Sequence, residues 1–311
     1  MDVRLPPQPW MTAANTAAVF DALEAIGGPG CARFVGGCVR NTLMGLGAVD
    51  VDISTTLKPE QVMSAAEAAG LRAVPTGLEH GTVTVIAGHA PFEVTTLRRD
   101  VETDGRRAVV AFATDWAEDA ERRDFRLNAL YADRDGTVWD FVGGGVEDAR
   151  EGRIVFVGDA ETRIREDYLR ILRFFRFLAF YGRGAPDAVG LEACARLRDG
   201  VKTLSAERIS KELLRLLEAP DPVPALRLMA ETGVLGVALP APLNLSRFEA
   251  MCRIDPDPLL RLSALLPDDP TRVGGLAQAL RLSNDQRERL LDALPQAPQV
   301  TDRKSTRLNS S

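Results

Sequence analysis

The sequence predicts an α+β protein in which a head with a mixed, antiparallel-rich sheet precedes an all-helical part. Short runs of apolar and β-branched residues occur between about residues 30 and 143, several of them facing one another across turns that contain glycine. After about residue 150 such runs nearly disappear, and segments with apolar residues at helical spacing follow, separated by Pro and Gly. Strands followed by consecutive helices are typical of an α+β fold.

Length and composition indicate a globular chain of two or three domains. Of its 311 residues, 45% are hydrophobic and 26% charged, and no apolar run is long enough to span a membrane. The first residues lack the pattern of a signal peptide. The four cysteines have no metal-site spacing, which favours a reducing, cytoplasmic setting. A formal net charge of −6 argues against a generic nucleic-acid binder, although residues 162–183 carry six arginines against two acidic residues.

The first half of the head is predicted from helix signals and apolar runs. We expect a helix over 12–26, ended by two glycines, and another over 58–70 with Pro59 in its first turn. Between them, a buried strand within 32–37 leads through a glycine turn into a helix over 38–45. A second strand is expected over 50–54.

The second half of the head begins with an expected hairpin over 81–98, whose β-branched runs meet around Gly88, His89 and Ala90. The polar, charged segment 98–113 is interpreted as a mobile loop. A helix is expected over 117–129. Two strands, 129–133 and 137–143, follow it on either side of a turn.

The second part of the chain is expected to be entirely helical, with Ser205 as the N-cap of one helix. The expected helices cover residues 160–181, 187–197, 205–218, 222–233, 246–252, 257–266, 272–280 and 284–294. The last residues, 301–311, are polar and without periodicity. A native disordered tail would explain them, but we interpret them as a non-native tail left by cloning, which implies a natural chain cut short near residue 300.

Asp50 and Asp52 are unusual because charged residues are disfavoured in strands. Residues i and i+2 of a strand project from the same face, so the two carboxylates would lie side by side. Adjacent like charges repel unless a cation lies between them, and Mg²⁺ commonly binds one or two carboxylates together with substrate phosphates. The pair therefore predicts a metal site, with a solvated edge strand as the alternative.

Gly36 and Gly37 lie between an expected strand and an expected helix, where glycine lets the backbone approach a ligand closely. The free N–H groups at the start of such a helix favour phosphate. Arg40, in the first turn, is unfavourable for the helix dipole, which indicates that it serves an anion. A plain tight turn would explain the glycines alone. Their combination with Arg40 and the paired aspartates is more specific, and it predicts a phosphate site.

A ridge of charged residues is expected on the helix over 160–181. Asp167, Arg170, Arg173 and Arg176 are spaced by three, so they would follow one slanting line on that helix. The residues between them are mostly apolar, which predicts that the ridge lines a cleft and faces something anionic or planar. The alternative is a surface face of salt bridges.

Two further segments carry clustered charges. In the expected helix over 117–129, Arg123 and Asp124 are followed by Asn128 four residues after the aspartate. In the expected helix over 205–218, Arg208 and Glu212 have the i, i+4 spacing of an ion pair. Alone, each segment would be an ordinary packing helix.

Together these segments resemble the class II tRNA nucleotidyltransferase and bacterial poly(A) polymerase family, and within it the CCA-adding enzymes. The matching segments lie within residues 30 to 220, in the family's order: FVGGCVRNTLMG, DVDIST, GTVTV, FEVTTLR, RRDFRLNALYAD, REDYLRILRFFRF and AERISKELLRLL. The resemblance implies a polymerase-beta-like nucleotidyltransferase head (1–150), a helical neck that recognises the base (151–220) and a helical RNA-binding body (221–300). Family members normally continue into a helical tail, so a tail domain is expected to be missing here.

The resemblance also implies an activity: template-independent addition of CCA to the 3′ end of tRNA from CTP and ATP, with release of pyrophosphate. Two Mg²⁺ ions, for which Mn²⁺ can substitute, would be held by the catalytic residues Asp50 and Asp52. Glu93 would be a third catalytic carboxylate near them, although an ordinary strand-face charge is its alternative interpretation. The tRNA 3′ end is the expected partner, and neither a membrane nor an obligate protein partner is expected.

A nucleotide site is implied on the other matched positions. Asp167 and Arg170 would read the base edge, because a carboxylate accepts from the amino group that C and A share and arginine donates to the adjacent ring acceptor. The base and the phosphates would be supported by Arg173 and Arg176. The remaining residues implied to bind the nucleotide are Gly36, Gly37, Arg40, Arg123, Asp124 and Asn128.

Two departures and several alternatives accompany the resemblance. Asn41 stands where the family usually has Asp, and Arg126 where it usually has Thr. A poly(A) polymerase shares the chemistry, as do enzymes that add only CC or only A, although the 98–113 segment argues against CC-only addition. A catalytically silent RNA-binding module would not need Asp50 and Asp52. A nucleotide hydrolase or sugar-nucleotide transferase would leave the arginine ridge unexplained.

Overall fold

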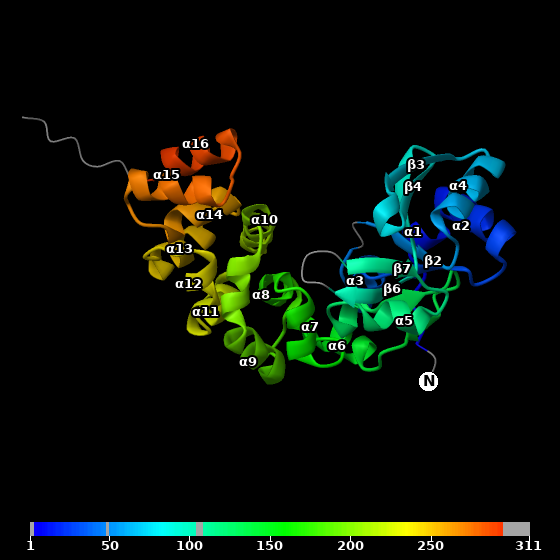
Figure 1. Cartoon of the computed structure of the whole chain (residues 1–311), viewed down its shortest axis with the longest axis horizontal. Helices are drawn as coiled ribbons and strands as arrows, with labels where there is room; N and C mark the ends of the chain where they lie inside the picture. Colours follow the sequence, from blue (N-terminus) through cyan, green and yellow to red (C-terminus); the bar gives the residue numbers. More distant parts are fainter. Residues whose placement is uncertain (1–2, 48–49, 104–107, 295–311) are drawn as a thin grey trace, which may run out of the picture.

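The structure is a computed structural model that describes residues 3–47, 50–103 and 108–294. Figure 1 shows a head that contains the sheet at one end of an elongated molecule, from which helices continue to α15 and α16 at the other end. The predicted α+β organisation, with a mostly antiparallel sheet followed by helices, is confirmed. The segment 301–311, interpreted as a non-native tail, lies outside the described residues.

The head is built on a seven-stranded sheet. Its strands, in spatial order, are β3 (Arg72–Gly77), β4 (Thr82–Ala87), β5 (Ala90–Thr96), β2 (Asp52–Thr55), β1 (Ala32–Val35), β8 (Leu130–Ala132) and β9 (Val138–Asp140). β2 and β5 pair in parallel, and the other neighbours pair antiparallel. The predicted hairpin β4–β5 is confirmed, with His89 at a φ of 66° in its turn, whereas β3 was not predicted.

Helices cover one face of this sheet and leave part of the other open. α2 (Ala14–Gly27) and α4 (Pro59–Ala68) pack on each other and on the sheet, as expected from their sequences. In β5 the alternation buries Phe92 and Val94 and exposes Glu93. The remaining helical elements of the head are α1 (Pro9–Thr12), α3 (Gly37–Leu43), η1 (Leu78–His80), α5 (Trp116–Glu121), η2 (Arg126–Asn128) and α6 (Gly145–Glu151).

The segment 98–113 is not a loop, so that prediction is wrong for its described residues. It forms a separate antiparallel ribbon of β6 (Arg98–Thr103) and β7 (Ala108–Phe112), while 104–107 lie outside the described residues. The charges that suggested a loop alternate with Val and Thr, which favour strands. Because the ribbon is not part of the seven-stranded sheet, its charged positions need not enter that sheet's core.

The expected helix over 117–129 is also wrong, because α5 ends at Glu121. Past this point the chain pairs with a later segment: the Val157 N–H donates to the Asp124 carbonyl at 3.0 Å, and the Arg126 N–H donates to Val155 at 2.9 Å. Arg126 then forms a bidentate ion pair with the buried Asp148, at 2.6 and 3.0 Å. This pair gives the unusual arginine a local partner in α6.

The second part of the chain is helical, as predicted, and Ser205 caps its helix as expected. Its elements are α7 (Ala160–Glu166), α8 (Leu169–Tyr181), α9 (Ala188–Arg196), η3 (Arg198–Thr203), α10 (Ala206–Leu217), α11 (Val223–Glu231), α12 (Val234–Ala238), α13 (Leu245–Cys252), α14 (Pro258–Leu265), α15 (Pro270–Ala279) and α16 (Asn284–Asp292). Within the described residues, no helix is both long and apolar enough to cross a membrane.

One continuous helix was expected over 160–181, but the chain breaks between α7 and α8. Asp167 is extended there, with φ −154° and ψ 104°. The ring of the next residue, Tyr168, packs so closely on Gly200 that a Cβ on that glycine would lie 2.0 Å from it. The break therefore places an aromatic side chain against η3, and it removes Asp167 from the predicted ridge.

Aromatic rings join the two parts of the chain. Phe125, in the head, lies 4.9 Å between ring centroids from both Phe156 and Phe177, and Phe156 stacks on Phe174 at 5.5 Å. These rings belong to one continuous core cluster that contains buried residues from Leu5 to Leu294. The head and α8 are therefore packed as one hydrophobic unit.

Arg261 is expected to stabilise the fold through backbone contacts alone. Its side chain is 2% exposed and donates to the carbonyls of Leu217, Ala219 and Asp255 at 2.6 to 2.9 Å, beside the end of α10. Arg261→Met keeps the length but removes these donors, so we expect the free energy of unfolding to fall by about 3 kcal/mol.

Urea unfolding followed by circular dichroism measures this effect. The matched control is Arg272→Met, at an exposed arginine of α15, which should change stability by less than about 0.5 kcal/mol. Equal effects of the two substitutions would contradict the role given to Arg261.

Candidate active site

Three carboxylates meet at the open face of the sheet. Asp52 begins β2 and pairs in register with Glu93 of the parallel strand β5, so both side chains leave the sheet on the same face. Asp50 precedes the strand, which begins two residues later than expected, so the i, i+2 reasoning does not place it. All three residues nevertheless line one cavity of about 740 Å³.

These carboxylates fit a divalent cation. Burial, followed by the charges of Glu93 and Asp50, raises the pKa of Asp52 to about 6, and Arg123 acts in the opposite direction. At Asp52, burial and the charges of the two neighbouring acids together outweigh the opposite effect of Arg123. In the part of the chain that the structure describes, no group of three or more His, Cys, Asp or Glu forms a set of metal ligands. Asp50 and Asp52 suit Mg²⁺, because this ion takes few carboxylate ligands and completes its coordination shell with substrate oxygens and water.

The glycine turn lies next to these acids, where β1 ends and α3 begins. Gly36 has φ 67°, a left-handed conformation that favours glycine. A Cβ there would lie 3.7 Å from the Asn128 carbonyl oxygen and 3.9 Å from Nη1 of Arg123. Gly37 begins α3. The turn is thus directly beside the guanidinium of Arg123.

Arg40 points from α3 into the joint between the head and α8. It is buried, its guanidinium lies 3.9 Å from the ring centroid of Tyr181, and Nη2 donates to the Tyr181 hydroxyl at 2.8 Å. Nη1 donates to Oδ1 of Asn128, and Nε and Nη2 donate to Oδ1 of Asn41 at 3.1 and 2.8 Å. All of these partners are neutral, so none of them is a carboxylate that would neutralise the charge of Arg40. Asn41, at a position where the family that the sequence resembles usually has Asp, supplies an acceptor that carries no charge.

Arg123 is held by a buried carboxylate that the sequence analysis did not single out. Its Nη2 donates to Asp119 at 2.9 Å and to Ser54 Oγ at 3.3 Å, and its Nε donates to the Tyr131 hydroxyl at 3.0 Å. Burial alone would raise the pKa of Asp119, but Arg123 and Arg122 hold it well below its usual range. The i, i+4 spacing of Asp119 and Arg123 was a signal that could have identified the pair.

Asp124 and Arg173 connect the head to α8. Nε of Arg173 donates to Oδ2 of Asp124 at 2.8 Å, and the Asn128 amide donates to Oδ1 at 3.3 Å. Burial alone would raise the pKa of Asp124, but Arg173 holds it below its usual range. Arg176 donates to Glu212 of α10 at 2.6 Å. The predicted Arg208–Glu212 pair is therefore wrong, since Glu212 binds the arginines of α8 instead.

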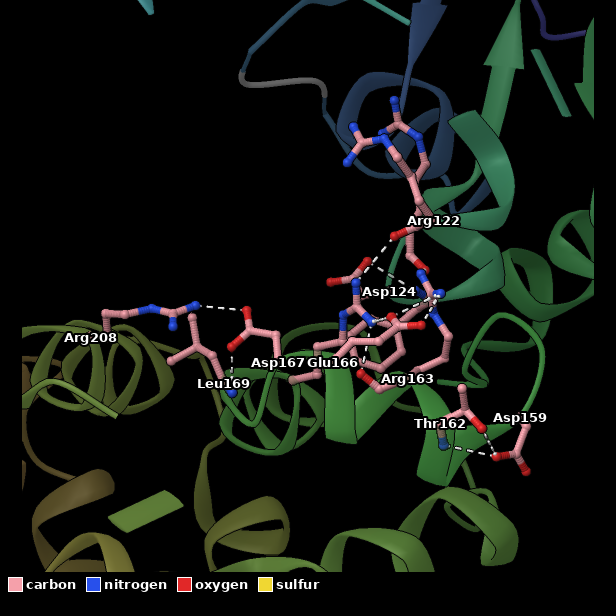
Figure 2. Close-up of polar contacts among 12 residues, drawn as sticks. Arg122, Asp124, Asp159, Thr162, Arg163, Glu166, Asp167, Leu169 and Arg208 are labelled. Atoms are coloured by element: carbon pink, nitrogen blue, oxygen red, sulfur yellow. Dashed lines mark hydrogen bonds and ion pairs between the residues drawn. The ribbon is translucent and has the colours of Figure 1, made fainter. Parts of the chain in front are cut away.

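The break between α7 and α8 presents Asp167, which Figure 2 shows joined by dashed lines to Leu169 and Arg208. Oδ1 accepts from the Leu169 N–H at 3.1 Å, and Oδ2 accepts from Nη2 of Arg208 at 2.7 Å. Arg170 follows on α8, where Nη1 contacts Glu166 at 2.5 Å and the Arg163 carbonyl at 2.8 Å. Arg170, Arg173 and Arg176 lie on one helix, α8, as the predicted ridge requires, whereas Asp167 lies before that helix, so the ridge is wrong for the aspartate. The ligand expected to face the ridge stays a prediction.

The predicted site residues consequently form two neighbouring groups. The first contains the acids of the cavity: Asp50, Asp52 and Glu93. The second follows the joint between head and α8: Gly36, Gly37, Arg40, Arg123, Asp124, Asn128, Arg173 and Arg176, with Arg170 and Asp167 at the start of α8. Residues that sequence reasoning missed are Asp119, Tyr131 and Tyr181, and the last of these had no sequence signal.

Comparisons with known proteins identify related proteins. A family model described as "Poly A polymerase head domain" matches residues 32–155, and one described as "Probable RNA and SrmB- binding site of polymerase A" matches residues 188–244. The mitochondrial CCA tRNA nucleotidyltransferase 1 of Mus musculus is 40% identical over 268 residues, which are 82% of this chain and 60% of that protein. The CCA-adding enzyme of Oceanobacillus iheyensis is 43% identical over 187 residues, 60% of this chain and 45% of that enzyme.

A solved structure is similar over nearly the whole chain. The CCA-adding enzyme of Bacillus stearothermophilus in complex with CTP has a TM-score of 0.68 and 32% identity, and the similarity covers 93% of this chain and 66% of that one. The matched regions are 60% and 45% of the two curated relatives reported above, so this chain spans about 60% or less of their length.

The raised pKa of Asp52 predicts a stability effect in protein stripped of divalent ions. A folded-state pKa of about 6, above the unfolded value of 3.8, means that ionising Asp52 costs free energy in the fold. This cost is absent well below pH 3.8, develops as the pH rises from 3.8 to about 6, and is complete above that pH. We expect Asp52→Asn to stabilise the fold by about 2 kcal/mol at pH 8, with little effect at pH 3.5.

Urea unfolding in EDTA at the two pH values measures this difference. Glu79→Gln, at an exposed carboxylate of η1, is the matched control and should change little at either pH. The same gain for Asp52→Asn at both pH values, or a loss of stability at pH 8, would contradict the electrostatic account.

Proposed function

The chain belongs to the class II tRNA nucleotidyltransferase and bacterial poly(A) polymerase family, and on this basis we propose that it adds CCA to the 3′ end of tRNA from CTP and ATP. The observation that carries the proposal is the position of the carboxylate pair Asp52 and Glu93 next to Arg123, the head residue beside the glycine turn. Nucleotidyl transfer needs metal-binding acids next to a site for a triphosphate, and we propose that this arrangement supplies both.

Asp50 and Asp52 would hold the metal ions, which we propose to be two Mg²⁺, with Mn²⁺ as a substitute, and Glu93 would complete the acidic group. When bound, the ions polarise the phosphate oxygens and favour ionisation of the attacking hydroxyl. In the reaction the 3′-oxygen of the RNA bonds to the α-phosphorus. The bond to the bridging oxygen breaks, pyrophosphate leaves with its electrons, and the hydroxyl proton passes to water.

The triphosphate would lie along the glycine turn. Gly36 and Gly37 have no side chain to fill the turn, and Arg123 is fixed beside it by Asp119 and Tyr131. An arginine that is already oriented loses little side-chain entropy on binding a phosphate. Arg40, whose direct partners are neutral, would add a positive charge nearby.

Base recognition would occur at the start of α8. Asp167 would accept from the amino group of C or A, and Arg170 would donate to the adjacent ring acceptor. U and G carry the opposite pattern and would leave a polar group unpaired. Arg173, Arg176 and the Asp124–Asn128 contact would support this pair from the joint.

The remaining assignments follow from the family. We propose that residues 1–150 are the catalytic head, 151–220 the neck and 221–300 an RNA-binding body, with the tRNA 3′ end, CTP and ATP as partners. Cys31, Cys38, Cys194 and Cys252 are all unpaired, which supports the proposed reducing, cytoplasmic setting. A poly(A) polymerase is the second candidate, because the head matches a family model with that description.

An incorporation assay tests the proposed function. The protein is incubated with Mg²⁺, a tRNA that ends before CCA, and each labelled nucleotide in turn. We expect addition of two C and one A. A long A tract would identify a poly(A) polymerase, and RNA binding without incorporation would identify a catalytically silent module.

Asp52→Asn is expected to lower incorporation to about 1% of wild type or less, because it removes a charged oxygen ligand from the metal site. CTP affinity, measured by calorimetry, should change little. Asp135→Asn, at an exposed carboxylate elsewhere in the head, is the matched control and should retain full activity. Full activity of Asp52→Asn would exclude this aspartate from the chemistry.

Asp167→Ala is expected to reduce the preference for C and A over U and G by about tenfold or more, since it removes the acceptor that distinguishes them. Competition between the four triphosphates measures this preference. Triphosphate affinity should fall much less. Unchanged selectivity would show that the base is read elsewhere.

A further inference from the structure

Tyr181, the last residue of α8, contacts Arg40 of α3 across the joint between the head and α8. Its ring centroid lies 3.9 Å from Cζ of the Arg40 guanidinium, and its hydroxyl oxygen accepts a hydrogen bond from Nη2 of that arginine at 2.8 Å. Among the hydrogen-bond partners of Arg40 in the described residues, Asn41 and Asn128 belong to the head, and Tyr181 comes from α8. The orientation of this arginine therefore depends on the end of α8.

The contacts of Arg40 leave its guanidinium little freedom. A guanidinium has five N–H groups. Within the part of the chain that the structure describes, Nε donates to Asn41, Nη2 donates to Asn41 and Tyr181, and Nη1 donates to Asn128. One N–H group, on Nη1, is left for a ligand. An arginine that is oriented in this way loses little side-chain entropy when it binds an anion.

Tyr181 holds Arg40 without cancelling its charge. The neighbouring Arg123 and Arg173 are bonded to carboxylates, whereas the face of an aromatic ring attracts a cation through its quadrupole and the phenol oxygen is an acceptor without a charge. Burial lowers the pKa of Arg40, while Tyr181 and then Asp124 act in the opposite direction. Because Asp124 is already bonded to Arg173, the charge of Arg40 stays available to an anionic ligand.

The nitrogen that Tyr181 holds lies beside the glycine turn. A Cβ on Gly37 would lie 3.8 Å from Nη2 of Arg40, and a Cβ on Gly36 would lie 3.9 Å from Nη1 of Arg123. Two guanidinium groups therefore flank the turn along which the triphosphate is proposed to lie. The group of Arg123 is oriented from within the head, and that of Arg40 is oriented from α8.

We propose that Tyr181 is a positioning residue for the triphosphate of the nucleotide. Its ring and hydroxyl hold Arg40 at the glycine turn, so α8 acts on both ends of the nucleotide: on the base at its start, through Arg170, and on the phosphates at its end, through Tyr181. The inference rests on the proposed nucleotidyl transfer. It adds a residue that lies outside the segments that carry the family resemblance.

Calorimetric titration of the full chain with CTP in the presence of Ca²⁺ tests this role. Tyr181→Leu removes both contacts to Arg40 and should weaken CTP binding about tenfold. Tyr181→Phe keeps the ring and removes the hydroxyl acceptor, so it should weaken binding about threefold. The matched control is Phe180→Leu, at the neighbouring residue whose ring contacts Arg215 of α10, and it should leave CTP affinity within about twofold.

A double variant shows whether Tyr181 acts through Arg40. When Arg40→Met is already present, Tyr181→Leu should change CTP affinity by less than about twofold, because the group that Tyr181 positions is gone. A packing role alone would give the full tenfold loss with or without Arg40. In steady-state kinetics, Tyr181→Leu should raise the KM for CTP about tenfold and leave the KM for the RNA primer within about twofold.

Two results would overturn the proposal: wild-type CTP affinity in folded Tyr181→Leu and Tyr181→Phe, or a loss from Tyr181→Leu that persists undiminished without Arg40. If Tyr181→Leu does not fold, Tyr181→Phe conserves the size of the side chain and decides by the same comparison. A wild-type protein that binds CTP but adds no nucleotide would count against the proposed function and not against the role of Tyr181.

Discussion

The ion pair between Asp124 and Arg173 is the contact on which the rest of the site depends. Asp124 belongs to the head, Arg173 to α8, and their atoms approach at 2.8 Å in a largely buried position. Breaking a buried pair leaves an uncompensated charge, which costs several kcal/mol. The pair therefore fixes how the first neck helix meets the sheet. Around it, the rings of Phe125, Phe156 and Phe177 exclude water and strengthen the electrostatic attraction.

The neighbouring arginines follow the same pattern, in which acids of the protein orient the cations. Asp119 holds Arg123, Glu166 holds Arg170, and Glu212 holds Arg176. Each guanidinium is thus placed before a ligand binds, and the acids keep the joint from accumulating positive charge. At the open face of the sheet the balance is reversed, since the charges of Glu93 and Asp50 outweigh that of Arg123 at Asp52. We propose that this asymmetry separates a triphosphate side from a metal side.

The sequence was sufficient to predict the fold class and to propose most residues of the candidate site, because both depend on local patterns. The glycine turn, the acids of β2 and the arginines of α8 were all visible as spacing. The misplaced elements depended on distant contacts: α5 ends early because residues near Phe125 pair with residues near Phe156, and α8 starts late because Tyr168 packs on Gly200. Tyr181 carried no signal, since tertiary packing alone brings it to Arg40.

The central claim is that the head–α8 joint is the nucleotide site and not only a structural contact. A double-mutant cycle of Asp124→Asn and Arg173→Gln, read by calorimetric titration with CTP in the presence of Ca²⁺, tests it most directly. The account predicts that each substitution weakens CTP binding and that the two effects are coupled by about 1 kcal/mol or more. The double variant should then bind CTP no more weakly than the single variant with the lower affinity. If both single variants remain folded and bind CTP with the wild-type affinity, the account is contradicted.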